Sequence, residues 1–247
     1  WSPKKAKKHV ALVGKGITFD TGGISLKPGS GMWDMISDMG GSAAMAAAII
    51  AAAKLNLKVG ITATLPLAEN MPGSDATRPG DVITHYGGIT SEVLNTDAEG
   101  RLILADALTL GAEESPDLMV SLATLTGAAR VALGPDLPPF YCDNDATADA
   151  LSRAGMAVRD PLWRMPFWDG YEPQIEPSIA DLDNAPSGGM AGSITAALFL
   201  RRFAEGSGRY VHMDIYGWQP TAAPGLPKGG AGQGARAILA ALPRILP

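Results

Sequence analysis

Short apolar runs alternate along the chain with longer stretches rich in alanine and leucine. Apolar runs of about four to eight residues are typical of buried strands, and the longer stretches have the length and composition of helices. This alternation predicts a layered α/β domain in which helices pack on a sheet. We expect strands at 9–13, 59–65, 81–84, 92–94, 118–124 and 210–215, and helices at 38–54, 101–113, 146–157, 192–205 and 235–242.

Local signals at two boundaries refine this picture. Ser37 or Asp38 is placed to cap the helix at 38–54, because serine and aspartate are preferred N-cap residues. The segment 220–234 is rich in glycine and proline, which predicts a long surface loop. No internal repeat or long linker divides the chain, so we expect residues 1–247 to form one domain.

Composition excludes several classes of protein. A hydrophobic content of 46% is enough for a substantial core. The net charge of −5 provides no overall positive field for a nucleic-acid backbone, so nucleic acid is not an expected partner. The longest purely apolar run, 43–53, is shorter than the roughly 20 residues that cross a bilayer, so no membrane partner is expected. The single cysteine, Cys142, cannot form an internal disulfide, which favours a reducing compartment and a cytoplasmic location.

Any metal site in this chain would need oxygen ligands. The three histidines lie far apart in the sequence and there is one cysteine, which excludes the usual His/Cys zinc clusters. Four acids stand instead at predicted strand ends and helix starts, where α/β folds place their active sites. They are Asp20, Asp38, Asp97 and Glu99.

Asp97 and Glu99 form the most informative pair. On an extended segment, residues two apart point to the same side, so these carboxylates could bind one ion together. Either acid alone could be a helix cap or an exposed loop residue. Packing both near apolar segments is costly, because like charges raise each other's pKa values, and divalent cations would remove that cost. On these residues alone both interpretations stay open.

Three basic residues belong to the same segments. Lys15 ends the first predicted strand, and Lys27 follows Asp20 by seven residues across a Gly-Gly turn. Either lysine could simply be a solvated surface residue. The sequence around Lys15 lacks the full spacing of a phosphate-binding loop. Arg101, in the first turn of a predicted helix, is either solvated or placed to hold an anion.

Taken together, these segments resemble the M17 family of leucyl aminopeptidases, the cytosol aminopeptidases. Residues 13–28 (VGKGITFDTGGISLKP) and 37–41 (SDMGG) resemble the family's two metal segments, and 95–102 (NTDAEGRL) matches its signature octapeptide in full. Similarity continues through 122–128 and 179–184. The resemblance implies a mixed β-sheet sandwiched between helices and a metal-dependent leucyl aminopeptidase. The chain would be the catalytic domain without the family's N-terminal domain.

The resemblance also implies a metal centre with two divalent ions. Hard carboxylate ligands suit Zn, Mn or Mg, and two such ions can share one hydroxide nucleophile that attacks the peptide bond. One ion would be held by Asp20, Asp97 and Glu99, and the second by Lys15, Asp20, Asp38 and Glu99.

Other matching residues would act on the substrate. Lys27 would polarise the scissile carbonyl group, and Arg101 would hold a bicarbonate ion that acts as the general base. A methionine-lined pocket would favour apolar N-terminal residues such as leucine. Family members are commonly hexamers, so we expect a homo-hexamer acting on peptides. The residues implied for substrate binding are Met35, Thr124, Leu125 and Gly127.

One region departs from the family pattern. Residues 216–236 differ from the Lys-Gly-Ala-Thr-Gly-Phe-Gly sequence usual near this point. Trp218 and the neighbouring prolines indicate a restructured loop at the substrate rim, with consequences for specificity rather than chemistry. Sequence drift in a surface loop explains the difference equally well, because loops tolerate change.

Two other functions compete with an aminopeptidase. A binding or regulatory protein would keep the fold, since some family members also bind DNA. Hydrolysis of phosphate esters is chemically possible at the same kind of two-metal site. Outside the site, His212 is interpreted as a core or interface histidine and Cys142 as a packing residue.

Overall fold

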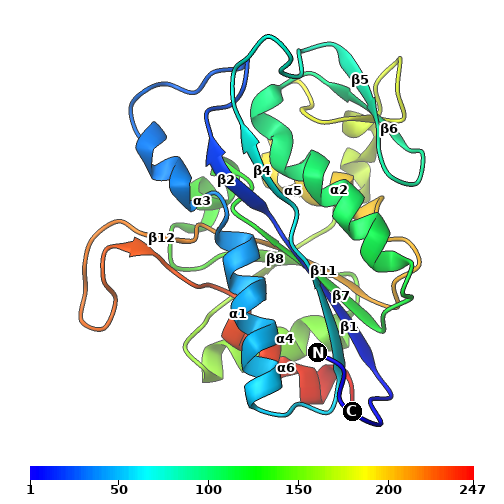
Figure 1. Ribbon diagram of the computed structural model, residues 1–247, viewed down its shortest axis with the longest axis vertical. Helices are drawn as coiled ribbons and strands as arrows, with labels where there is room; N and C mark the ends of the chain where they lie inside the picture. The colour runs from blue at the N-terminus through cyan, green and yellow to red at the C-terminus, as the bar shows by residue number, and fades with distance from the viewer.

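A computed structural model describes residues 1–247 and shows a central sheet of six strands between layers of helices (Figure 1). Strands β8 and β11 are antiparallel, and all other neighbouring strands of this sheet are parallel. The predicted mixed sheet sandwiched between helices is therefore confirmed. In spatial order the strands are β3 (Gly60–Thr64), β1 (His9–Gly14), β7 (Leu118–Ala123), β11 (Tyr210–Asp214), β8 (Pro139–Tyr141) and β9 (Trp163–Met165).

Helices cover both faces of this sheet because its inner strands are apolar on both sides. Val10 and Leu12 of β1 point into one core, and Ala11 and Val13 point into the other, as the alternation of side chains along a strand requires. The first core is closed by α1 (Gly40–Lys54), α4 (Asp145–Ala157) and α6 (Ala235–Ile245), and the second by α2 (Glu99–Ala112) and α5 (Gly192–Arg201).

Smaller elements surround one end of the sheet. The short parallel pair of β2 and β4 places Asp20 directly opposite Asn70. The hairpin of β12 and β13 projects from the body of the protein at the left of Figure 1. These elements are β2 (Gly16–Asp20), β4 (Leu67–Asn70), β5 (Asp81–Thr84), β6 (Thr90–Val93), β10 (Leu182–Asp183), β12 (Trp218–Gln219), β13 (Gly229–Gly230), α3 (Gly127–Leu133) and the 3-10 helices η1 (Met32–Ser37), η2 (Thr96–Ala98) and η3 (Asp169–Ile175).

Every predicted strand and helix has a counterpart, and the differences lie mainly at the ends. The predicted helix at 38–54 begins at Gly40, and neither Ser37 nor Asp38 caps it: its N-cap is Met39, which makes no side-chain capping bond. Residues 32–37 form η1 instead, and the Asp38 carboxylate turns away to other partners. The loop predicted at 220–234 includes β13, which pairs with β12.

The segment Met32–Lys54 is long and apolar enough to cross a membrane by length and composition. In the structure this segment is divided between η1 and α1, and α1 packs on the sheet through Ala44, Met45 and Ala48. We therefore describe α1 as a core helix of the domain.

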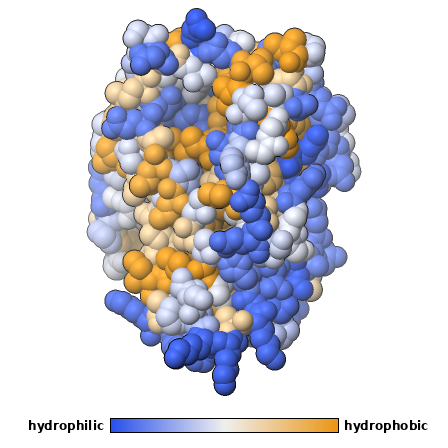
Figure 2. Space-filling view, turned by 45° about the vertical axis from the view of Figure 1, so that its right-hand side comes forward, coloured by the Kyte–Doolittle hydropathy of each residue, from blue (hydrophilic) through white to orange (hydrophobic).

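Large apolar side chains are also exposed. Leu67, Leu110 and Ile50 are each about half exposed or more. In Figure 2 apolar residues gather over the left and middle of one face, and polar residues cover its right side and lower end. Exposed apolar areas of this kind often mark contact surfaces between proteins.

Candidate active site

The predicted site residues come together at one edge of the central sheet. Strands β1 and β7 are parallel, so their carboxyl ends meet at this edge, where α/β folds bind ligands. Lys15 directly follows β1, Asp20 ends β2, and Thr124 directly follows β7. The remaining acids arrive from helix starts: Asp38 precedes α1, Asp97 lies in η2 and Glu99 begins α2.

Two glycines allow the helices to approach the strands this closely. A Cβ atom on Gly41, near the start of α1, would lie 2.1 Å from the carbonyl oxygen of Leu122. A Cβ atom on Gly100, in the first turn of α2, would lie 2.5 Å from Lys15 Cε. No side chain fits at either position without moving its neighbours, so the site depends on both glycines.

Lys15 occupies the innermost part of the site. Its Nζ atom lies 2.7 Å from Asp38 Oδ2 and 2.9 Å from Glu99 Oε1, and it donates to the carbonyl oxygen of Thr124 at 3.2 Å. Burial alone would lower the pKa of Lys15, but the carboxylates of Asp38 and Glu99 outweigh burial and raise it. Burial raises the pKa of Asp38 to about 6, although Lys15 opposes that shift.

Lys27 also pairs with two carboxylates, and it lines the cavity. Its Nζ atom lies 2.8 Å from Asp20 Oδ2 and 2.5 Å from Asp97 Oδ1. Burial lowers the pKa of Lys27, but bonds to these two carboxylates raise it above its ordinary value. Burial also raises the pKa of Asp97, against the influence of Lys27. Two lysines and four acids thus share one small volume.

The donor set fits divalent cations. One carboxylate oxygen from each of Asp20, Asp97 and Glu99 can be chosen so that all three lie within 4.8 Å of one another. The buried oxygens Asp38 Oδ2, Asp97 Oδ1 and Glu99 Oε1 have no hydrogen-bond partner beyond the two lysine ammonium groups. Clustered carboxylate oxygens of this kind are the ligands that hard divalent ions prefer.

The route by which Asp97 and Glu99 converge differs from the prediction. These residues do not lie on an extended segment: Asp97 is in the 3-10 helix η2, and Glu99 starts α2. The turn forms because the Asn95 side chain accepts a hydrogen bond from the Asp97 backbone N–H at 2.9 Å. The reasoning from strand geometry was therefore wrong, although the two carboxylates do approach each other.

Asn70 is a site residue that the sequence analysis missed. Its Nδ2 group donates to Asp20 Oδ1 at 2.9 Å, to Glu99 Oε2 at 3.2 Å and to the Thr96 carbonyl oxygen at 2.9 Å. It therefore orients two of the acids at once. No motif marks Asn70, because only the pairing of β4 with β2 brings it beside Asp20.

Arg101 is buried near the same acids but pairs with none of them. Its side chain makes no ion pair within 4.0 Å, and its Nε atom has no hydrogen-bond partner. Burial lowers the pKa of Arg101 to about 10, while the more distant charges of Asp214, Glu99 and Asp183 act in the opposite direction. A buried guanidinium group with free donors can bind an anion.

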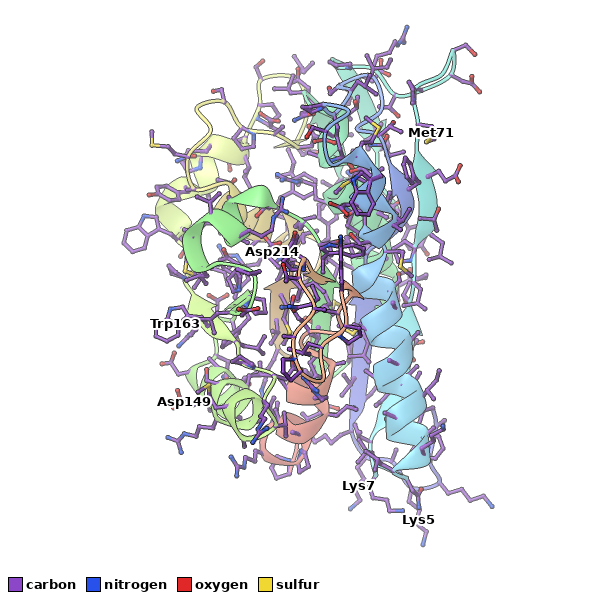
Figure 3. The ribbon with its side chains drawn as sticks, turned by 90° about the vertical axis from the view of Figure 1, so that its left-hand side faces the viewer. Lys5, Lys7, Met71, Asp149, Trp163 and Asp214 are labelled. Carbon is purple, nitrogen blue, oxygen red and sulfur yellow. The ribbon has the colours of Figure 1, made fainter.

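Asp214, at the end of β11, is a second residue that the sequence analysis missed. Its carboxylate accepts hydrogen bonds from the backbone N–H groups of Leu125 and Thr126 at 3.2 and 3.0 Å. It also accepts from the hydroxyls of Thr126 and Ser193 at 2.6 and 2.8 Å. Figure 3 shows Asp214 inside the molecule, whereas Lys5 and Lys7 project from one end. Asp214 therefore holds the loop that follows β7.

A cavity of about 510 Å³ opens onto these groups. Most predicted site residues line it, while Glu99 and Arg101 lie behind its wall. Tyr216 and Trp218 also line this cavity, so the divergent segment does border it. The predicted residues in the lining are Lys15, Asp20, Lys27, Met35, Asp38, Asp97, Thr124, Leu125 and Gly127.

Comparison with known proteins identifies the family. Residues 1–239 match the model of the cytosol aminopeptidase family, catalytic domain. The chain belongs to this family.

Relatives within the cytosol aminopeptidase family are close in sequence. A probable cytosol aminopeptidase of Corynebacterium diphtheriae is 53% identical over 237 residues, which cover 92% of this chain and 47% of that protein. A probable cytosol aminopeptidase of Chlorobium luteolum is 51% identical over 238 residues, covering 96% of this chain and 47% of that protein. The chain thus spans about half the length of these relatives.

Solved structures of the family superimpose well. The cytosol aminopeptidase of Coxiella burnetii matches with a TM-score of 0.94 and 43% identity, covering 99% of this chain and 53% of that one. The bottromycin maturation enzyme BotP in complex with Mn matches with a TM-score of 0.92 and 37% identity, covering 98% of this chain and 54% of that one.

Two residues that the sequence places outside the site, His212 and Cys142, are buried and do not line the cavity. His212 is fully buried, and its Nδ1 atom lies 2.8 Å from Ser121 Oγ while its Nε2 atom has no partner. Cys142 is 3% exposed, and burial raises the pKa of its thiol. A buried, protonated thiol is a poor nucleophile, which supports a packing role.

Proposed function

We propose that this chain carries the active site of a metal-dependent aminopeptidase that removes N-terminal residues from peptides. The observation that carries the proposal is the convergence of Asp20, Asp97 and Glu99 within 4.8 Å, beside two lysines, next to a cavity that Asp20 and Asp97 line. Membership of the cytosol aminopeptidase family supports this activity. The same cluster of acids would also suit phosphate-ester hydrolysis, and family membership favours the peptidase. The net charge of −5 does not favour DNA binding.

The proposed metal centre contains two divalent ions of the Zn, Mn or Mg type. Bound divalent ions would polarise the scissile carbonyl group and lower the pKa of a water molecule. The Mn complex of a structural neighbour supports the choice of a divalent metal. We assign Asp20, Asp97 and Glu99 to one ion, and Lys15, Asp20, Asp38 and Glu99 to the other. Lys15 would bind as the neutral amine, a form that the positive charge of the two ions would favour.

Two basic residues complete the proposed machinery. The Lys27 ammonium group lines the cavity beside Asp20 and Asp97, where it can donate a hydrogen bond to the substrate carbonyl oxygen. The buried Arg101 guanidinium group, whose Nε atom has no partner, would hold a bicarbonate ion as the proton acceptor. Arg101 lies behind the cavity wall, close enough for the charge of Glu99 to oppose the lowering of its pKa by burial.

The cavity wall supports a preference for an apolar first residue such as leucine. Met35 supplies a flexible apolar surface, and Gly127 leaves space for a side chain. Thr124 donates its hydroxyl hydrogen to Asp38 Oδ1 at 2.7 Å, which fixes its side chain in the cavity wall. We assign the Leu125 backbone to substrate contact, with Asp214 holding that backbone in place.

We also propose a homo-hexamer that acts in the cytoplasm. The exposed apolar side chains of the domain support assembly of several copies, because such areas are usually covered by a partner. The names of the curated relatives, cytosol aminopeptidases, support the location.

The proposal is tested by hydrolysis of leucine p-nitroanilide by the Mn²⁺-loaded protein. We expect Asp97→Ala to lower activity by about 100-fold or more, because it removes a metal ligand. The matched control is Asp149→Ala, on the exposed surface of α4 away from the site (Figure 3), which should leave activity unchanged. A wild-type protein that binds Mn²⁺ yet hydrolyses none of a panel of aminoacyl anilides would contradict the proposal. Parallel assays with p-nitrophenyl phosphate test the alternative chemistry.

A further inference from the structure

Arg130 is a cation at the mouth of the cavity that the proposed chemistry does not use. It lies on α3, one turn after Gly127, and it lines the same cavity as Lys15 and Lys27. A Cβ atom built on Gly127 would lie 3.7 Å from Arg130 Nη2. The guanidinium group is thus directed back along the helix toward the cavity wall, as the tilt of helical side chains favours.

The guanidinium group is held on an aromatic platform. Its central carbon lies 4.8 Å from the centroid of the Tyr216 ring, within the range of a cation–π contact. The platform is itself anchored: the backbone N–H groups of Tyr216 and Gly217 donate to Gln233 Oε1 at 3.1 and 2.9 Å. Gln233 in turn donates to the Pro135 carbonyl oxygen at 2.8 Å. Arg130 is therefore positioned before any ligand arrives, which reduces the entropy that binding would cost.

Arg130 also differs from the two lysines of the cavity in having no acidic partner. Lys15 and Lys27 each contact two carboxylates within 3 Å. Arg130 has no carboxylate within the 4.0 Å of an ion pair, and its side chain donates no hydrogen bond to the protein. A stacked guanidinium group keeps its N–H donors free at its edge, and their spacing matches the two oxygens of a carboxylate.

We propose that Arg130 forms a carboxylate-binding subsite at the cavity mouth, so that the enzyme prefers peptides with a carboxylate near the scissile bond. This inference rests on the proposed aminopeptidase function. The carboxylate has two chemical sources: the free C-terminus of a short peptide, or the side chain of an aspartate or glutamate residue. Both present the same planar pair of oxygens to the guanidinium group.

Paired substrates of equal size distinguish these sources in the Mn²⁺-loaded enzyme. Leu-Gly against Leu-Gly-amide tests the C-terminal carboxylate. Leu-Asp-amide against Leu-Asn-amide tests a carboxylate on the side chain of the second residue. Glu p-nitroanilide against Gln p-nitroanilide tests a carboxylate on the side chain of the first residue. In at least one pair we expect the acid to have a kcat/KM about fivefold higher, which is the upper range for an exposed ion pair. That preference should fall as salt is added, because salt screens exposed charges.

Substitutions assign the preference to Arg130. We expect Arg130→Gln to bring the ratio of acid to amide close to one, and Arg130→Lys to keep part of it, since lysine retains the charge without the forked donors. The matched control is Arg153→Gln, which changes an exposed arginine on α4 outside the cavity and should leave the ratio unchanged.

The outcomes separate this inference from the function on which it rests. Ratios near one in all three pairs, with leucine p-nitroanilide still hydrolysed, would overturn the subsite and leave the aminopeptidase standing. An equal loss of preference in Arg130→Gln and Arg153→Gln would also overturn it, because overall charge would then explain the effect. Complete inactivity of the metal-loaded wild type on every peptide and anilide would overturn both proposals.

Discussion

Replacing Asn70 with alanine tests how the acids of the site are held. Asn70 donates to carboxylate oxygens of Asp20 and Glu99 and to the Thr96 carbonyl oxygen. In Asn70→Ala these three acceptors lose their shared donor, and the two carboxylates become free to rotate. We expect weaker metal binding with the fold retained.

The size of the effect follows from these contacts. A hydrogen bond to a charged group contributes about 1.5 kcal/mol at the lower end of its range, and Asn70 makes two such bonds. Water that enters the space left by the amide would replace part of this energy. A net loss of about 2 kcal/mol corresponds to about a 30-fold higher Kd for the ion. This value lies within the range known for residues that orient metal ligands.

Isothermal titration calorimetry of the metal-free protein with Mn²⁺ measures this Kd. The matched control is Asn144→Ala, because Asn144 caps α4 by accepting from the Thr147 N–H at 2.9 Å. Loss of that cap should lower the free energy of unfolding by about 1 kcal/mol and leave the Mn²⁺ affinity unchanged. A wild-type Kd in Asn70→Ala would refute the assignment, and so would an equal loss of affinity in Asn144→Ala, which would indicate general destabilisation.

Two further predictions concern residues around the site. In Gly100→Ala the new methyl group would lie 2.5 to 2.7 Å from Lys15 Cε, Cδ and Nζ. We therefore expect Lys15 to be displaced and the activity on leucine p-nitroanilide to fall about tenfold or more. An unchanged kcat/KM would contradict this expectation, because it would show that the site adapts to the methyl group. His212 gives a pH dependence of stability: burial, with a smaller effect of Arg101, lowers its pKa from 6.5 to about 3. The unfolded chain therefore binds more protons than the folded protein between these two values, and stability falls as the pH drops below 6.5. Urea unfolding measures the difference in free energy of unfolding between the wild type and His212→Gln. We expect this difference to change by about 2 kcal/mol against the wild type between about pH 8 and about pH 5. A difference that stays constant with pH would contradict a buried, neutral histidine.

The strands and helices of the two cores were largely predictable from the sequence. β1, β7 and β11 are largely apolar, and nearly all of their residues are buried, so their hydrophobic pattern marks them. α2 and α4 were predicted to within about two residues. The short elements β2, β4, β8 and β9 were not predicted, because each has few residues and little apolar periodicity of its own.

The acids and lysines of the site were also identified from their local motifs, but their arrangement was not. Asp38 looked like a helix cap, and only the tertiary structure shows its carboxylate paired with Lys15 and Thr124. Asp97 and Glu99 were expected to meet along a strand, and they meet instead across a 3-10 turn. A side chain's type limits its chemistry, while its direction depends on backbone dihedral angles that neighbouring elements select.

The sequence by itself determined the side chains from which the proposed metal centre is built, because carboxylates and lysines stand in its family-like segments and His and Cys are few. Only the tertiary structure decided which residues support that centre. Asn70 reaches Asp20 across 50 residues, and Asp214 reaches Thr126 across 88. Likewise, the position of Arg130 over Tyr216 depends on how α3 packs beside the segment that follows β11. Hydrogen bonds and stacking act over a few ångströms, so partners far apart in sequence are chosen only when the sheet brings their strands together.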